Sequence, residues 1–564
     1  PLVSSSAASD VYKRQGFYLP RRIGLSPSQG THCSSLRKTS KNGVSEPPSP
    51  GLLLLFKSAL TVNDASKQSI SSSWNRELAA IIKRFGIRTQ TFGGTPNERA
   101  VLRWWVCEPS TPCRVSIMAT ESTSKNDASS ELKIVKDATC TFCGCVCDDI
   151  ELHVEGQHIT KAKKACVLGT AWFLNHEIEN RPSCLIEGKP ASVDEGIERA
   201  AQILARSRYP LIYGLSDTTV ESQRVAVSIA DWAGSNIDTT TSVCHGPSGM
   251  AFQGVGEVTC SLGEVRNRGD LIVFWGSNPA ESHPRHFTRY SLMPKGMFVP
   301  NGRKDRTCVI VDVRKTKSAK AADLFIQIQP RKDFEALWVL RALAQGIELD
   351  PEQVQHDTGQ PLEVWTDLMS RMKAARFGVI FFGMGLTMTR GKHANSEALL
   401  ALTRDMNRYT RFVCKPNRGH GNVTGADNVV TWRTGYPFGV NLGRGYPRFN
   451  PGEYTASDIL ARGEADAAMI IASDPAANFS QPARNHLANI PYIALDPKET
   501  PTTRGAAVAF SVATYGINVP GTAYRMDDVP ISLRTAFDSP HPSDYEILKG
   551  IEKRIRELKF GLAT

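Results

Sequence analysis

The sequence lacks long hydrophobic runs, although 41% of its 564 residues are hydrophobic. The run GLLLLF covers only residues 51–56, whereas a membrane-spanning helix needs about 20 apolar residues. No convincing small-residue cleavage site follows it, which argues against a secretory signal peptide. We therefore expect a cytoplasmic protein without a membrane anchor.

Acidic residues are scarce near the N-terminus. Residues 1–117 contain 16 Lys and Arg against 6 Asp and Glu, while the remaining chain is almost balanced at 51 against 50. The leader therefore carries +10 of the net charge of +11, and this charge does not indicate a nucleic-acid partner. Because the leader is polar and Ser-rich, we expect it to be disordered or non-native, with Met118 as an ordinary protein start. A transit peptide is the alternative.

Cysteine is also sparse, because 13 in this length are too few for a disulfide-stapled secreted protein. Cys140, Cys143 and Cys147 nevertheless form a CxxCxxxC motif, and Cys166 follows. Thiolates on a tight loop with a distant fourth ligand suit an iron–sulfur cluster. Zinc is the alternative, although its sites more usually combine two separated CxxC knuckles. Cys145 is spare in this assignment and can exchange roles with Cys147.

The chain after the cysteines predicts an α/β fold. The segment DDIELHVEGQHITKA alternates apolar and polar residues around a Gly turn, which indicates a small antiparallel hairpin. Amphipathic helices and short apolar strands then alternate, beginning with SVDEGIERAAQILARSR and PLIYGLS, and this pattern predicts layered parallel sheets covered by helices. The expected domains are an iron–sulfur subdomain at 118–189, α/β halves at 190–375 and 376–540, and a C-terminal helix at 541–564.

Two pairs of strands resemble each other. The segments LIVFWGSNPAESHPRH and CVIVDVRKTKSAKAADLFI are echoed by AMIIASDPAANFSQPARNH and YIALDPKETPTTRGAAVAF. An internal duplication of a nucleotide-binding α/β unit explains this similarity, and it predicts two similar ligand-binding halves.

Several motifs together resemble the B subunit of formylmethanofuran dehydrogenase, a family of the molybdopterin oxidoreductase superfamily. They are CTFCGCVCDDIELHVEGQHI, TTTSVCHGPSG, WGSNPAESHPRH, VDVRKTKSAKAAD and NRGHGNVTGADNV. The resemblance covers nearly all of residues 130–540 and extends to the bacterial relative in the formyltransferase/hydrolase complex. It implies a molybdopterin-oxidoreductase-like fold, a [4Fe-4S] cluster, and tungsten or molybdenum held by a bis(pterin guanine dinucleotide).

The resemblance also assigns roles to individual residues. Cys244 matches the cysteine that binds the metal, and the adjacent His245 can relay a proton. Arg418 would hold a carboxylate such as formate, with His420 as a further candidate. Polar residues at the duplicated strand ends look like the pterin nucleotide site, although each can instead cap a helix. These residues are Asn278, Glu281, His283, Asp312, Arg314, Thr316, Ser318, Ser473, Asp474, Asn478 and Asp496.

The activity implied by the resemblance is reversible two-electron interconversion of carbon dioxide and formate. A separate amidohydrolase-like subunit would join formate to the methanofuran amine. The sequence leaves no length for the C-terminal β-barrel of larger relatives, so we expect a small β-barrel subunit as a second partner. Two alternatives stay open: a non-redox structural subunit of a bacterial complex that releases formate from a formyl carrier, and a zinc-ribbon binding module on an α/β domain.

Overall fold

The computed structural model describes residues 132–562, so the predicted leader at 1–117 lies outside the described residues. The described chain begins with an antiparallel sheet of β1 (Lys133–Cys140), β2 (Cys147–Glu155) and β3 (His158–Lys163). Buried and partly exposed residues alternate along β2, which confirms the predicted hairpin. The helix α4 (Val167–Leu174) follows it.

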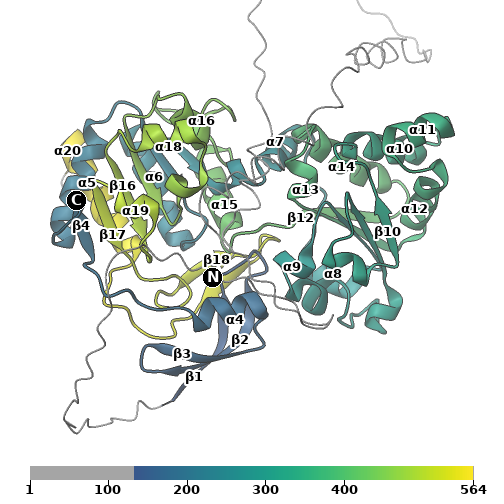
Figure 1. The fold of residues 1–564 in the computed structure, drawn as a ribbon, viewed down its shortest axis with the longest axis horizontal. Helices are drawn as coiled ribbons and strands as arrows, with labels where there is room; N and C mark the ends of the chain where they lie inside the picture. The colour runs from purple at the N-terminus through teal and green to yellow at the C-terminus, as the bar shows by residue number, and fades with distance from the viewer. Residues whose placement is uncertain (1–131, 563–564) are drawn as a thin grey trace, which may run out of the picture. The chain divides into compact units, whose positions relative to one another are not determined.

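A five-stranded sheet forms from the middle of the chain, and every strand pair in it is parallel. Its strands in spatial order are β10 (Leu324–Gln327), β9 (Thr307–Asp312), β8 (Leu271–Trp275), β11 (Phe377–Phe382) and β12 (Arg411–Pro416). One face packs on α10 (Asp333–Gln345), α12 (Leu362–Ala374) and α14 (His393–Met406) (Figure 1). The other face packs on α8 (Leu262–Arg268) and on buried residues of β2, including Ile150 and Leu152.

A second sheet has nine strands. In spatial order they are β14 (Arg448–Phe449), β13 (Val440–Asn441), β7 (Asn236–Thr239), β6 (Pro210–Gly214), β15 (Ala467–Ile471), β16 (Tyr492–Asp496), β17 (Val508–Ser511), β4 (Cys184–Ile186) and β5 (Lys189–Pro190). The five strands from β7 to β17 are parallel, but both edges are antiparallel. The expectation of purely parallel sheets is therefore wrong here, because short hairpins extend each edge.

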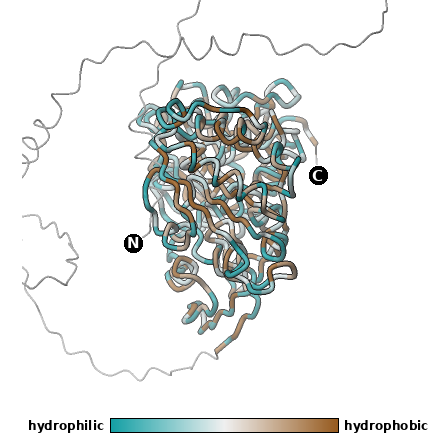
Figure 2. The backbone as a smooth tube through the Cα atoms, turned by 90° about the vertical axis from the view of Figure 1, so that its right-hand side faces the viewer, coloured by the Kyte–Doolittle hydropathy of each residue, from teal (hydrophilic) through white to brown (hydrophobic). Residues whose placement is uncertain are grey.

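Helices cover both faces of the nine-stranded sheet (Figure 1). One face carries α5 (Val193–Arg206), α6 (Val220–Ala233), α15 (Val423–Thr434) and α20 (Asp544–Phe560), and the other carries α16 (Ala456–Ala461) and α18 (Gln481–Leu487). The predicted helix after residue 190 is confirmed as α5, whose Ser192 and Glu195 form a capping box. Figure 2 shows hydrophobic colour along neighbouring strands, as expected for strands buried on both faces.

Five parallel strands of one sheet correspond in position to five parallel strands of the other. The order β12-β11-β8-β9-β10 in the first sheet corresponds to β7-β6-β15-β16-β17 in the second. The sheets do not follow the division expected at 375/376, because β8, β9 and β10 precede that point while β11 and β12 follow it in the same sheet. In the five-stranded sheet, β8, β9 and β10 come before β11 and β12 in the chain. In the nine-stranded sheet the corresponding strands β15, β16 and β17 come after β6 and β7.

The remaining described elements connect or close these layers. They are α7 (Gly246–Val255), α9 (Pro279–Ser282), α11 (Pro351–Thr358), α13 (Met384–Thr387), α17 (Pro475–Asn478), α19 (Pro501–Arg504), β18 (Gly521–Tyr524) and β19 (Pro530–Leu533). Among residues 132–562, no helix combines the length and hydrophobicity that crossing a bilayer requires.

Gly378 in β11 provides a test of this packing. A Cβ atom at this position would overlap the ring of Phe412 on β12, so Gly378→Ala should destabilise the protein by about 1–3 kcal/mol through overpacking. Gly263→Ala in α8 is the matched control, since its nearest neighbour is Ser261 Oγ at 3.4 Å and Ala is the better helix former. Chemical denaturation measures both variants, and equal midpoints would contradict the described packing of β11 on β12.

Candidate functional site

The loops after β7 and β12, from different sheets, meet at a buried ion pair. Arg418 Nη1 donates to Asp427 Oδ2 at 2.6 Å and to Thr241 Oγ1 at 3.0 Å. Asp427 also accepts hydrogen bonds of 2.8 Å from Thr239 Oγ1 and Thr241 Oγ1. Because Thr241 belongs to the loop that carries Cys244, these bonds hold Arg418 beside the Cys244 loop.

His245 is buried and Cys244 is half-buried near this ion pair. Burial raises the pKa of the Cys244 thiol to about 11, although the nearby Arg418 opposes the shift. Burial lowers the pKa of His245 to about 3, and its Nδ1 lies 3.3 Å from Ser248 Oγ. His245 Nε2 is buried without a hydrogen-bond partner among the described residues. A half-buried thiol and an unpartnered imidazole nitrogen on adjacent residues fit an additional group bound at this loop.

The cysteine motif surrounds a small cavity. Its lining includes all five predicted sulfur residues, namely Cys140, Cys143, Cys145, Cys147 and Cys166. Cys166 caps α4, where its Sγ accepts a hydrogen bond of 3.4 Å from Gly169 N. A Cβ atom on Gly169 would lie 3.1 Å from Cys140 Sγ, so glycine lets α4 approach the sulfurs. The cavity therefore brings together the ligand types that an iron–sulfur cluster uses.

The thiols have different electrostatic environments. A hydrogen bond with Cys145 lowers the pKa of Cys143 to about 6, and burial raises the pKa of Cys147 to about 11. Arg285 also lines the cavity, and it donates two hydrogen bonds of 2.6 Å to the Asp149 carboxylate. This arrangement does not choose between Cys145 and Cys147 as the third ligand of the motif, beside Cys140, Cys143 and Cys166. Within residues 132–562, no three His, Cys, Asp or Glu side chains are arranged to hold a single metal ion.

The loop between β1 and β2, called the cysteine loop here, contacts the loop that carries Arg418. Gly144 N donates to Gly419 O at 3.3 Å, and His283 Nε2 lies 2.7 Å from Arg418 O. A Cβ atom on Gly144 would overlap Arg418 O, and one on Gly421 would overlap a carbonyl of the cysteine loop. The Gly-rich sequence around Arg418 therefore permits close approach of these two loops.

The duplicated strand ends share a hydrogen-bond pattern. Asn278 Oδ1 accepts from Ser318 N at 3.2 Å and from Ser318 Oγ at 2.7 Å, and Asp474 Oδ1 accepts from Thr502 N at 3.1 Å and from Thr502 Oγ1 at 2.6 Å. The amides of Ala280 and Ala476 then donate to Ser318 Oγ and Thr502 Oγ1 at 3.0 and 3.1 Å.

Thr502 was not among the predicted residues. Aligning TKS at 316–318 with TPT at 500–502 would have found it.

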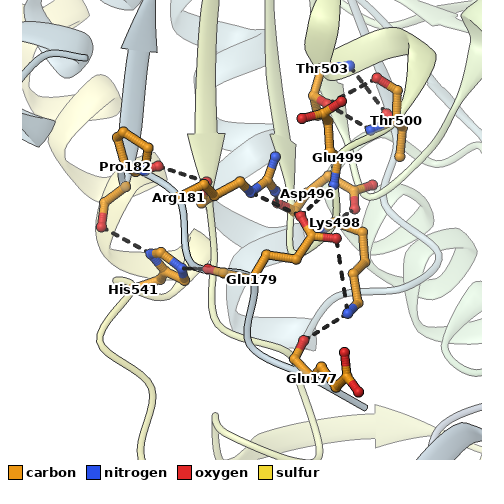
Figure 3. Close-up of polar contacts among 12 residues, drawn as sticks. Glu177, Glu179, Arg181, Pro182, Asp496, Lys498, Glu499, Thr500, Thr503 and His541 are labelled. Atoms are coloured by element: carbon orange, nitrogen blue, oxygen red, sulfur yellow. Dashed lines mark hydrogen bonds and ion pairs between the residues drawn. The ribbon is translucent and has the colours of Figure 1, made fainter. Parts of the chain in front are cut away.

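The other predicted strand-end residues have varied surroundings. Burial raises the pKa of Asp312, and it raises that of Asp496 to about 7. Asp496 accepts from Lys498 N at 2.8 Å, while Arg181 donates to its carbonyl oxygen at 3.0 Å (Figure 3). Thr316 Oγ1 is buried without a partner among the described residues. Glu281, Arg314 and Asn478 are exposed, and Ser473 is half-buried.

His420 lies beside a carboxylate that the sequence did not single out. Its Nδ1 is 3.0 Å from Asp217 Oδ2, and this carboxylate raises the pKa of His420 although burial opposes the shift. Tyr515 Oη lies 3.2 Å from Asp217 Oδ1 and 3.1 Å from Thr141 O. These contacts connect His420 with the cysteine loop.

A second cavity of about 180 Å³ lies next to Arg418. Its lining includes Arg418, Asp427, Lys415, Glu257 and Asp528. Sequence reasoning missed the three acids Asp427, Glu257 and Asp528. Asp427 lies within the recognised NRGHGNVTGADNV segment, but nothing in the sequence near Glu257 indicates that this residue lines a cavity.

Comparison with known proteins establishes the family, although no family model matches the chain. The chain is 46% identical over 439 residues to the B subunit of tungsten-containing formylmethanofuran dehydrogenase 2 of Methanocaldococcus jannaschii, and the match covers 76% of this chain and 100% of that relative.

Two solved structures are similar as well. The X-ray crystal structure of the formyltransferase/hydrolase complex FhcABCD from Methylorubrum extorquens, in complex with methylofuran, contains a chain with 25% identity and a TM-score of 0.55, covering 66% of this chain and 99% of that chain. Acetylene hydratase from Pelobacter acetylenicus has 11% identity and a TM-score of 0.57, covering 75% and 69%, which shows a shared fold. The identity to the Methanocaldococcus protein over its full length means that the chain belongs to the family of formylmethanofuran dehydrogenase B subunits.

Proposed function

We propose that this chain is the molybdenum- or tungsten-pterin subunit that interconverts carbon dioxide and formate in a formylmethanofuran dehydrogenase complex. The observation that carries the proposal is the ion pair of Arg418 and Asp427. Both residues hydrogen-bond to Thr241 of the Cys244 loop, and the loop that carries Arg418 contacts the loop that lines the cysteine cavity. Reduction of carbon dioxide to formate needs an electron-transfer site close to the site that binds the carboxylate.

The residues present fit the cofactors that the family resemblance implies. Cys140, Cys143, Cys147 and Cys166 would hold a [4Fe-4S] cluster, and Cys244 would bind the metal. The recurring pairs Asn278–Ser318 and Asp474–Thr502 would order the loops that hold the two pterin nucleotides. When bound, the pterin-held metal supplies the two-electron redox chemistry.

The protein contributes binding and proton transfer. Both described bonds of Arg418 use Nη1, which leaves Nε and Nη2 to bind a carboxylate. Asp427 fixes the guanidinium before substrate arrives, and such preorganisation is a main source of electrostatic catalysis. His245 Nε2 is the unpartnered nitrogen beside Cys244, where it would accept or return a proton.

The family places this chain in a multisubunit complex. An amidohydrolase-like subunit would join formate to the methanofuran amine, and a small β-barrel subunit would cover the pterin site.

The second candidate is a non-redox structural subunit of a formyltransferase/hydrolase complex that releases formate from a formyl carrier. The 25% identity to a chain of the Methylorubrum complex favours it. The five grouped sulfur residues and the buried pair of Arg418 and Asp427 favour the redox function, because a structural subunit has no need of either.

Metal content tests the proposal. The complex purified anaerobically should contain iron together with tungsten or molybdenum, because both the cysteine cavity and Cys244 offer thiolate ligands. Mass spectrometric metal analysis of the intact complex measures this. Absence of these metals would support the structural subunit instead, and zinc alone would support the zinc-ribbon alternative.

Two cysteine variants test whether Cys147 or Cys145 is a cluster ligand. Cys147→Ala should lose the iron–sulfur absorbance and the bound iron, because Cys147 lies across the strand pair from Cys140 and faces Arg285 at the cavity. Cys145→Ala is the matched control and should retain both, since Cys145 is the spare residue of the motif. Iron quantification with visible spectroscopy distinguishes them, and the reverse result would exchange the roles of Cys145 and Cys147.

A further inference from the structure

Glu257 is a half-buried acid that the proposed mechanism does not use. It follows the end of α7 and lines the 180 Å³ cavity beside Arg418. Its Oε1 is buried without a hydrogen-bond partner, and Glu257 forms no ion pair within the described part of the chain. A carboxylate kept only for stability would be paired, because an unsatisfied buried polar atom costs free energy.

Titratable groups from several elements influence the carboxyl group of Glu257. They are Lys415 of β12, Arg418 after β12, Asp528 between β18 and β19, and the thiols of Cys260 and Cys414. Lys415 is buried, and its Nζ lies 3.4 Å from Met526 O. Asp427 also lines the cavity, but it is already paired with Arg418.

The balance of these influences places the pKa of the Glu257 carboxyl group close to neutral pH. Burial raises the pKa of Glu257 to about 7, Lys415 and Arg418 oppose this shift, and Asp528 adds to it. A proton-transfer group works best when its pKa lies close to the working pH. The polar cavity is also far larger than the roughly 10–15 Å³ that one water molecule requires.

We infer that Glu257 exchanges the reaction proton between water in this cavity and the Arg418 side of the active site. The inference rests on the proposed function. In the reductive direction carbon dioxide receives one proton and two electrons, so that one C–H bond forms and formate results. A reduced iron–sulfur electron carrier would supply the two electrons, and Cys140, Cys143, Cys147 and Cys166 would hold the cluster that accepts them. Glu257 gives up the proton, and its carboxylate regains one from cavity water that exchanges with solvent.

The pH dependence of the intact complex tests this inference. Reduction of carbon dioxide needs protonated Glu257, so its rate should fall as the pH rises through about 7, whereas formate oxidation should rise over the same range. Glu257→Gln should lower both rates by about 10²-fold and remove this pH dependence. Glu257→Asp keeps the carboxyl group and should restore part of the rate.

Two further variants separate proton transfer from a structural effect. Asp528→Asn removes a neighbouring negative charge, so the midpoint of the pH profile should move to lower pH. Glu363→Gln, an exposed acid on α12, should change neither rate nor profile. An unchanged rate and profile in Glu257→Gln would overturn the inference.

Infrared difference spectroscopy gives a readout independent of turnover. The carbonyl absorbance of protonated carboxylic acids that titrates near pH 7 should include a Glu257 component in the wild-type complex and in Glu363→Gln. Glu257→Gln should lose this component, while other buried acids such as Asp496 keep theirs in all three proteins. Absorbance in Glu257→Gln as large as in the wild type would overturn the assignment. If the wild-type complex is active and the Glu257→Gln complex behaves in the same way, this inference alone is contradicted. If the wild-type complex contains its metals but has no formate activity, the proposed function is contradicted and the inference with it.

Discussion

The buried ion pair between Arg418 and Asp427 is the interaction on which the candidate site depends. Removing either partner would leave an uncompensated buried charge, which typically costs about 3–5 kcal/mol. Thr239 and Thr241 satisfy the remaining oxygen positions of Asp427, so the pair also fixes the loop that carries Cys244. One interaction therefore sets the relative positions of a substrate-binding cation and a metal-binding thiol.

Close backbone approach connects this ion pair to the cysteine cavity. Gly144 and Gly421 have no Cβ atoms, and any larger residue at either position would overlap the opposing loop. The contact between Gly144 N and Gly419 O then keeps the sulfur residues next to the Arg418 loop. Such proximity explains how a small iron–sulfur subdomain can serve a site that is built from two separate sheets.

Much of the local structure could be predicted from the sequence. The capping box at Ser192, the hairpin after Cys147 and the alternation of strands with helices follow from short-range patterns. The division into halves could not be predicted, because strand neighbours depend on long-range packing that periodicity does not encode. The chain leaves one sheet after β7, builds the other, and returns to the first with β13 and β14 before it forms β15.

The same distinction holds within the candidate site. Cys140, Cys143 and Cys166 were found from spacing, and Cys244 and Arg418 from resemblance. Asp427 and Glu257 were missed because their importance comes partly from residues distant in sequence, Thr241 for Asp427 and Lys415 for Glu257. Thr502 is intermediate, since the internal repeat already aligns it with Ser318.

The central claim is that the cysteine cavity and the Cys244 loop form one redox site. Electron paramagnetic resonance of the partly reduced complex tests this most directly, because two paramagnetic centres in adjoining loops broaden or split each other's signals. We predict an iron–sulfur signal magnetically coupled to that of pentavalent tungsten or molybdenum. Two well-resolved signals without any coupling, or no signal from either centre, would contradict the account.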